Sequence, residues 1–111
     1  MKIPYDSPQL DSVLDALANQ KRRGILHELS LQPATVSRLA RNFELTLPAI
    51  HKHIRLLESA GLIIRRKSGR TNFIALNPKT LGLAQRWIGQ YKTDWGNADA
   101  SLTNYIARMQ E

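Results

Sequence analysis

The sequence predicts a mostly α-helical fold with one small β-hairpin, an α+β architecture formed by a single domain of 111 residues. Several segments repeat apolar residues at the spacing of an α-helix, and capping or turn residues separate them. A separate stretch, residues 62–76, contains two β-prone runs joined by a polar turn at Ser68-Gly69. A chain of this length can bury a modest core, which dimerisation would help to complete.

The first helix is predicted from its capping residues. Ser7 provides an N-cap and Pro8 suits the first turn of a helix that runs from about Gln9 to Ala18. Its apolar stripe consists of Leu10, Val13, Leu14 and Leu17.

A second helix is predicted to begin near Asn19. Its apolar positions are Ile25, Leu26 and Leu29. We expect His27 to lie among these core residues. The basic side chains expected to be mostly solvated are Lys21, Arg22 and Arg23. Gly24 costs about 1 kcal/mol relative to alanine within a helix, so it weakens the helical pattern without ending it.

Residues 35–60 are predicted to form two closely connected helices. Thr35 can cap a short third helix, and Thr46 can cap a fourth. The buried positions of the third helix are Val36, Leu39, Ala40 and Phe43. The short connection at Glu44-Leu45 is typical of a helix-turn-helix motif, in which the second helix enters the major groove of DNA.

The predicted fourth helix has an apolar side and a cationic side. Pro48 suits its first turn, and Gly61 suits the left-handed backbone at its end. The apolar side carries Leu47, Ile50, Ile54 and Leu57, and the opposite side carries Pro48, Lys52, Arg55 and Ser59. Taken alone, this pattern also fits an ordinary amphipathic surface helix.

The hairpin that follows directly, at residues 62–76, carries the cations Arg65, Arg66, Lys67 and Arg70. A helix with one cationic face, followed by a hairpin with a cationic tip, indicates a winged helix-turn-helix that binds DNA. A solvated turn is the alternative role for the wing residues.

Charge and composition narrow the choice of partner. The formal net charge of +7 favours a polyanion. An anionic membrane surface is the weaker alternative, because the basic residues are spread through folded segments and no apolar run approaches the ~20 residues of a membrane span. The absence of cysteine excludes disulfides, thiol nucleophiles and thiolate metal sites. Residues 1–10 lack the apolar segment that directs secretion, so we expect a cytoplasmic protein.

Linked residue groups between Leu14 and Asn77 match a known family. They comprise the run Leu14–Ser30 and the groups Leu39-Ala40, Pro48-Ala49, Lys52-His53, Leu57, Ala60-Gly61-Leu62 and Gly69-Arg70. In these residues the chain resembles the ArsR-type winged helix-turn-helix repressors. The resemblance implies a homodimeric transcription factor, usually a repressor, whose fourth helix and wing contact DNA.

Two departures from the family pattern limit what the resemblance implies. Many members carry serine where this chain has His51, so their base preference cannot be transferred at that position. The metal-sensing branch uses cysteines on the third helix, or aspartate and histidine on the last one. Here the third helix has neither cysteine nor histidine, and no histidine follows Asn77. We therefore expect no metal and no other cofactor, as in a non-metal branch with a tryptophan-containing C-terminal segment.

The C-terminal residues 79–110 are predicted to form two amphipathic helices. The first repeats Leu81, Ala84, Ile88 and Tyr91, and the second, after a break at Gly96-Asn97, repeats Leu102, Tyr105, Ile106 and Met109. A small core has little uncovered surface for them, so we expect them to pair with the first helix across a two-fold dimer interface. The family resemblance implies the same. The expected interface residues are Leu10, Val13, Leu14, Leu83, Trp87, Tyr91, Trp95, Leu102 and Ile106.

Two histidines lie on the fourth helix. His51 projects toward the flank of the cationic face, where it can donate to a phosphate or a base edge. His53 projects to the other flank, where we expect it to pack or to bond the backbone. Because they are two residues apart, they diverge by ~200° on a helix and cannot chelate one metal ion together.

The expected activity is binding to double-stranded DNA, with no catalysis. Lys52 and Arg55 are expected to reach base edges in the major groove. The full set of expected DNA-binding residues is Ser37, Thr46, Pro48, His51, Lys52, Arg55, Arg66, Lys67 and Arg70. Two-fold symmetry would place the two recognition helices about 34 Å apart and require an inverted-repeat operator.

The sequence also allows functions other than sequence-specific DNA recognition. A winged helix can serve as a protein-interaction module, and a basic face can bind DNA without sequence preference. A nuclease needs carboxylates or a histidine arranged for metal or acid–base chemistry, whereas the acidic residues here are scattered. The effector is open: a small molecule between the terminal helices, a protein partner or none.

Overall fold

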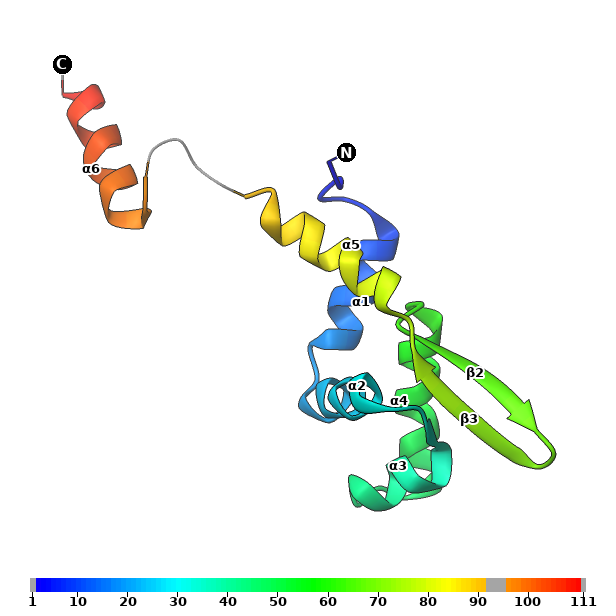
Figure 1. Cartoon of the computed structure of the whole chain (residues 1–111). Helices are drawn as coiled ribbons and strands as arrows, with labels where there is room; N and C mark the ends of the chain where they lie inside the picture. The colour runs from blue at the N-terminus through cyan, green and yellow to red at the C-terminus, as the bar shows by residue number, and fades with distance from the viewer. Residues whose placement is uncertain (1, 92–95, 111) are drawn as a thin grey trace.

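The computed structural model describes residues 2–91 and 96–110 of the chain. The elements in order are α1 (Pro8–Leu17), α2 (Gln20–Leu31), β1 (Ala34–Thr35), α3 (Val36–Asn42), α4 (Leu47–Ser59), β2 (Ile63–Ser68), β3 (Thr71–Leu76), α5 (Pro78–Gly89) and α6 (Ala98–Met109). Figure 1 shows α1 to α5 gathered around one body, from which the β2–β3 hairpin extends. The predicted mostly α-helical architecture with a small sheet is confirmed.

Side-chain caps fix where the helices begin. The side-chain oxygens of Ser7, Asn19, Thr35 and Thr46 each accept from the backbone N–H three residues further on, which satisfies a donor that the helix itself leaves open. The predicted caps Ser7, Thr35 and Thr46 are therefore confirmed, and Asn19 is a further cap. Helix α1 begins one residue earlier than expected, at Pro8.

The sheet contains one strand that the sequence did not reveal. Its order is β1-β3-β2, and all neighbours are antiparallel. The short strand β1 pairs Ala34 with Ile74 and Thr35 with Phe73, which ties the start of α3 to the wing. At the tip, Ser68 pairs with Thr71, so the turn residues are Gly69 and Arg70, one position later than predicted. Gly69 has φ +62°, which glycine adopts at little cost.

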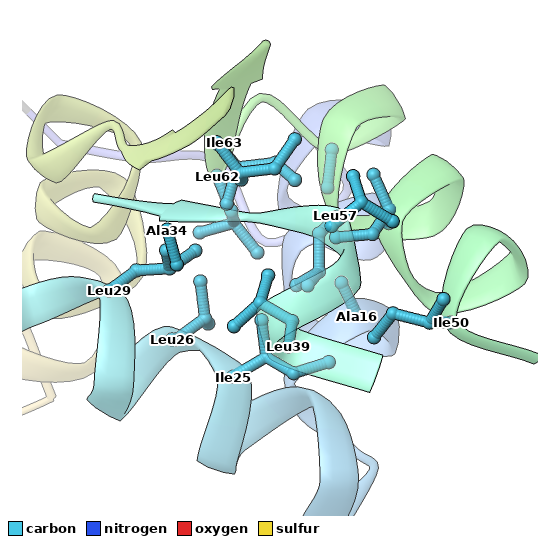
Figure 2. Close-up of a cluster of buried hydrophobic side chains, with 14 of the residues drawn as sticks. Ala16, Ile25, Leu26, Leu29, Ala34, Leu39, Ile50, Leu57, Leu62 and Ile63 are labelled. Carbon is cyan, nitrogen blue, oxygen red and sulfur yellow. The ribbon is translucent and has the colours of Figure 1, made fainter. Parts of the chain in front are cut away.

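One apolar core joins α2, α3, α4 and the sheet. Figure 2 shows Ile25 and Leu29 of α2, Leu39 of α3 and Leu57 of α4 pointing toward one another. The fully buried side chains also include Ile50, Ile54, Leu62 and Ile74. Burying one such side chain stabilises the fold by roughly 1.5–3 kcal/mol, so α4 is held with its apolar side inward.

Three predictions about burial are wrong, for one shared reason. Leu10 is 1% exposed and Val13 is fully buried, so neither has surface left to offer a second subunit. His27 is exposed instead of lying in the core. Leu47 is 56% exposed although it belongs to the apolar stripe of α4. Helical periodicity gives the direction of a side chain but not how far the neighbouring elements extend over it.

Gly24 lies in the middle of α2 because Phe43 packs against it. A Cβ atom at this position would lie 2.7 Å from Cε1 of the Phe43 ring, closer than atoms can approach. Phe43 is partly buried and packs on the core. The helix-weakening glycine therefore makes room for an aromatic ring.

We expect Gly24→Ala to destabilise the protein by about 1–2 kcal/mol, because overpacking outweighs the gain in helix propensity. Urea unfolding followed by circular dichroism measures the change. The matched control is Gly89→Ala in α5, where a Cβ would have no atom within 4 Å among the described residues. A Gly24→Ala variant as stable as the control would show that Phe43 moves aside freely.

Hydrogen bonds connect the C-terminal end of α4 to the start of α5. Gly61 has φ +79°, as its predicted left-handed position requires. Its carbonyl accepts from the hydroxyl of Thr80 at 2.6 Å and from the side-chain amide of Asn77 at 3.0 Å. The end of α4 and the first C-terminal helix are therefore coupled by partly buried polar contacts.

The last helix, α6, stands apart from the rest of the protein in Figure 1. Within residues 96–110 no residue of α6 is buried, and Leu102, Ile106 and Met109 are more than half exposed. No helix within residues 2–91 or 96–110 is both long enough and apolar enough to cross a membrane. Trp95, an expected interface residue, lies outside the described residues.

Candidate nucleic-acid interface

The outward face of α4 carries the predicted cations. Lys52 and Arg55 are exposed, and so are Thr46 and Pro48 at the start of the helix. On the opposite side Ile50, Ile54 and Leu57 are fully buried. Because the buried side fixes the rotation of the helix, the cationic side is held facing away from the protein.

A tight turn sets the angle between α3 and α4. Glu44 adopts φ +53°, an uncommon conformation for a residue other than glycine. The N–H of Leu45 donates to the carbonyl of Ala40 at 2.9 Å, which closes the end of α3. The predicted short connection of a helix-turn-helix is confirmed.

A cleft of about 200 Å³ joins three separate parts of the chain. It is lined by Thr35, Val36 and Ser37 at the start of α3, Leu47 and His51 on α4, and Arg70, Thr71 and Asn72 at the wing tip. The structure therefore brings together Ser37, His51 and Arg70, which were predicted separately as DNA-binding residues. The cleft is therefore lined by a hydroxyl, an imidazole and a guanidinium, all of which can donate hydrogen bonds.

The wing places its cations on two faces. The side chains of a strand alternate, so Arg65 and Lys67 lie on one face of β2 and Arg66 on the other, opposite Phe73. Arg65 forms an ion pair with Glu58 of α4 at 3.2 Å. This partly exposed pair contributes at most ~1 kcal/mol, and it links the wing to α4. Arg66, Lys67 and Arg70 are exposed.

The side chain of Arg22 makes contacts that could not be predicted from the sequence. Its Nε donates to the carbonyl of Ala16 at 2.8 Å, and one terminal nitrogen donates to the carbonyl of Asp15 at 3.1 Å. The other terminal nitrogen lies 3.3 Å from Nδ1 of His53. Arg22 was expected in solvent, and His53 was expected to pack or to bond the backbone. Instead the guanidinium joins the end of α1 to α2 and α4, where it satisfies carbonyls that a helix end leaves open.

The contact with Arg22 also fixes the protonation of His53. A guanidinium has no acceptor, so Nδ1 of His53 must accept and the imidazole is neutral. Burial lowers the pKa of His53 below its ordinary value of about 6.5, and the positive charges of Arg22, Lys52 and Lys21 lower it further. Protonation would place two positive charges in contact.

We expect the stability of the protein to fall as the pH drops below about 6.5, the pKa of histidine in the unfolded chain. Between that value and the lower pKa of folded His53, the unfolded chain binds a proton that the folded state does not, so acid favours unfolding. Urea unfolding at a series of pH values measures this. His53→Gln keeps an acceptor for Arg22 and should remove this part of the pH dependence; identical pH curves for both proteins would contradict the assignment.

Among the residues that the structure describes, no group of three or more histidine, aspartate or glutamate side chains is arranged to hold a metal ion. The chain contains no cysteine that could add a ligand.

Comparison with known proteins identifies the family. Residues 17–66 match the model of a helix-turn-helix domain. The chain is 32% identical to the HTH-type transcriptional regulator Rv2034 of Mycobacterium tuberculosis over 89 residues, which cover 80% of this chain and 81% of that protein. The crystal structure of an ArsR family transcriptional regulator has a TM-score of 0.73 and 37% identity, and the match covers 81% of this chain and 91% of that one.

The chain belongs to the ArsR family. An ArsR-like regulator from Rhodococcus sp. RHA1 has a similar structure, with a TM-score of 0.77 and 28% identity over 93% of this chain and 94% of that one. The transcriptional repressor SdpR of Bacillus subtilis is 27% identical over 71% of this chain and 88% of its own length. The family resemblance and the winged helix-turn-helix fold are confirmed. This ArsR-family protein is a DNA-binding transcriptional regulator, and the relatives named here are regulators and not enzymes.

Proposed function

We propose that this ArsR-family regulator is a homodimeric repressor that binds an inverted-repeat operator through α4 and the wing. The observation that carries the proposal is the exposed cationic surface of these elements. The cations are Lys52 and Arg55 on α4 and Arg66, Lys67 and Arg70 on the wing. The burial of the opposite side of α4 orients this surface, and the net charge of +7 attracts DNA as a whole.

The proposed contacts divide by chemistry. Lys52 and Arg55 read base edges in the major groove, because long cations can donate to the N7 and O6 atoms of guanine. Ser37, Thr46 and His51 lie beside the first turns of α3 and α4, where they donate to phosphates. Pro48 packs on the DNA strand to which these phosphates belong. The wing residues contact the backbone or the adjacent minor groove, which positions the protein without specifying sequence.

The proposed dimer joins the terminal helices of two copies. An amphipathic helix of this length is marginal in water unless its apolar side is covered, and the apolar side of α6 is exposed within one chain. A second copy offers the same unburied side, as two-fold symmetry requires. Leu14, Leu83 and Trp87 are partly buried and Tyr91 is 59% exposed, so all four keep surface for a partner. Trp95 remains in the proposal, whereas Leu10 and Val13 are withdrawn from it.

Repression follows from occupying a promoter, and the similarity to the transcriptional repressor SdpR supports it. The protein acts in the cytoplasm, where its DNA lies, by binding alone and without catalysis. A metal cofactor has no part in the proposal.

The experiment that tests this proposal is selection of duplexes from a randomised DNA pool by the purified full chain, with sedimentation to give stoichiometry. We expect an inverted repeat that binds two protomers at least ~10³-fold more tightly than a scrambled duplex. A pool that converges on no sequence would contradict specific recognition and favour a non-specific DNA-binding protein. No binding at physiological salt would favour a protein-interaction module.

On the selected duplex, Arg55→Ala should cost about 1–3 kcal/mol per half-site and relax the preference at one base pair. Lys79→Ala, which removes an exposed cation from α5, is the matched control. Equal loss of affinity for all sequences would place Arg55 on the phosphates and not on a base.

A further inference from the structure

Leu47 is the first residue of α4, and its side chain is 56% exposed. The core of the protein reaches along α4 only as far as Ile50, which is fully buried, whereas Thr46, Leu47 and Pro48 are all exposed. The first turn of the helix therefore extends beyond the body of the protein. A single exposed leucine is ordinary on a protein surface, so a functional role for Leu47 must be argued from the residues around it.

The surroundings of Leu47 are those of the proposed DNA surface. It lines the cleft that also contains Ser37, His51 and the wing-tip residue Arg70. Pro48 follows it about 100° further around the helix, on the side that carries Lys52 and Arg55, so the first turn of α4 exposes two apolar side chains. Lys52 and Arg55 come on the next turns of the same helix. An apolar tip is thus held among cations and hydroxyl groups at the end of the helix that enters DNA first.

The major groove offers such a tip one apolar feature at the base edges, the 5-methyl group of thymine. The N-terminal residues of a recognition helix are the ones that contact base edges in helix-turn-helix proteins. We propose that Leu47 is a specificity-determining residue that contacts the 5-methyl group of one thymine in each half-site. This inference rests on the proposed function and adds the base that the tip of α4 selects.

The test removes only the 5-methyl group of thymine from the DNA. In the duplex selected from the randomised pool, each thymine of a half-site and its symmetry mate are replaced in turn by deoxyuridine, which lacks only the 5-methyl group. The wild-type protein should lose about fourfold in affinity for each buried methyl, hence about 15-fold for the symmetric pair, at one thymine position. Leu47→Ala should bind the thymine duplex correspondingly more weakly and should no longer distinguish it from the deoxyuridine duplex.

Two variants complete the design. Leu56→Ala removes another exposed leucine from the same helix, nine residues from Leu47, and should keep the full preference for thymine. Leu47→Met retains an apolar side chain of similar size, so this variant should keep most of the preference for thymine over deoxyuridine. Because Leu47 is largely exposed, circular dichroism of the variants should match that of the wild type.

The outcomes separate the inference from the function on which it rests. A selected inverted repeat whose binding does not change at any deoxyuridine position overturns the inference and leaves the operator model standing. A preference for thymine that Leu47→Ala retains also overturns it, because another group then reads the methyl. A pool that yields no preferred sequence overturns both.

Discussion

Replacing Leu102 and Ile106 of α6 by glutamate should convert the proposed dimer into monomers. Both side chains are exposed within one chain, at 64% and 51%, so the substitutions leave the fold of the protomer unstrained. In a two-fold interface, however, the four carboxylates of two copies would be desolvated without partners, which costs several kcal/mol. We expect at least a ~10³-fold weaker dimer, measured by sedimentation velocity at micromolar concentration.

The control for this change is Ala107→Glu, which adds a carboxylate about 140° around the helix from Leu102 and should leave the dimer intact. DNA binding gives a second readout. A monomer reaches a single half-site, so the affinity for the complete operator should fall by orders of magnitude while the affinity for an isolated half-site changes little. A double variant that stays dimeric would remove α6 from the interface and leave α1 and α5 to form it.

Replacing Arg66, Lys67 and Arg70 by glutamine should produce the largest loss of DNA affinity. Each of these exposed cations can neutralise one phosphate, and a dimer presents six of them to an operator. Each phosphate contact contributes roughly 0.9 to the slope of log affinity against log salt, so the slope should fall by about 5. The affinity at physiological salt should fall by about 10³-fold or more. Titrations of fluorescent duplexes at several salt concentrations measure both quantities.

The matched control removes the same charge elsewhere, by replacing the exposed Lys2, Lys79 and Arg86 with glutamine. If the wing cations attracted DNA only at long range, both triple variants would lose the same DNA affinity. If they contact DNA directly, the wing variant should lose much more affinity than the control. Arg65 is left in place because its ion pair with Glu58 links the wing to α4. The single variant Arg66→Gln tests whether the face of β2 opposite to Lys67 also contacts DNA, because Arg66 lies on that face.

The helices and the wing could be predicted from local signals in the sequence. Thr35 and Thr46 cap their helices because a hydroxyl oxygen can reach an N–H three residues further on, a relation that depends on no distant contact. Gly61 likewise ends α4 in the left-handed conformation that glycine tolerates. The strand β1 escaped prediction because two residues carry no periodicity, and only its pairing with β3 defines it.

Every helix, both strands of the wing and the cationic face of α4 could thus be predicted from the chain, whereas β1 could not, because capping, turns and helical spacing act within a few residues. Which side chains remain exposed depends on the packing of distant elements. This packing buried Leu10 and Val13, left Leu47 uncovered at the tip of α4, and brought Arg22 to His53 across 31 positions of sequence. Burial and long-range hydrogen bonds depend on where distant elements end against one another, and a local pattern in the chain does not contain that information.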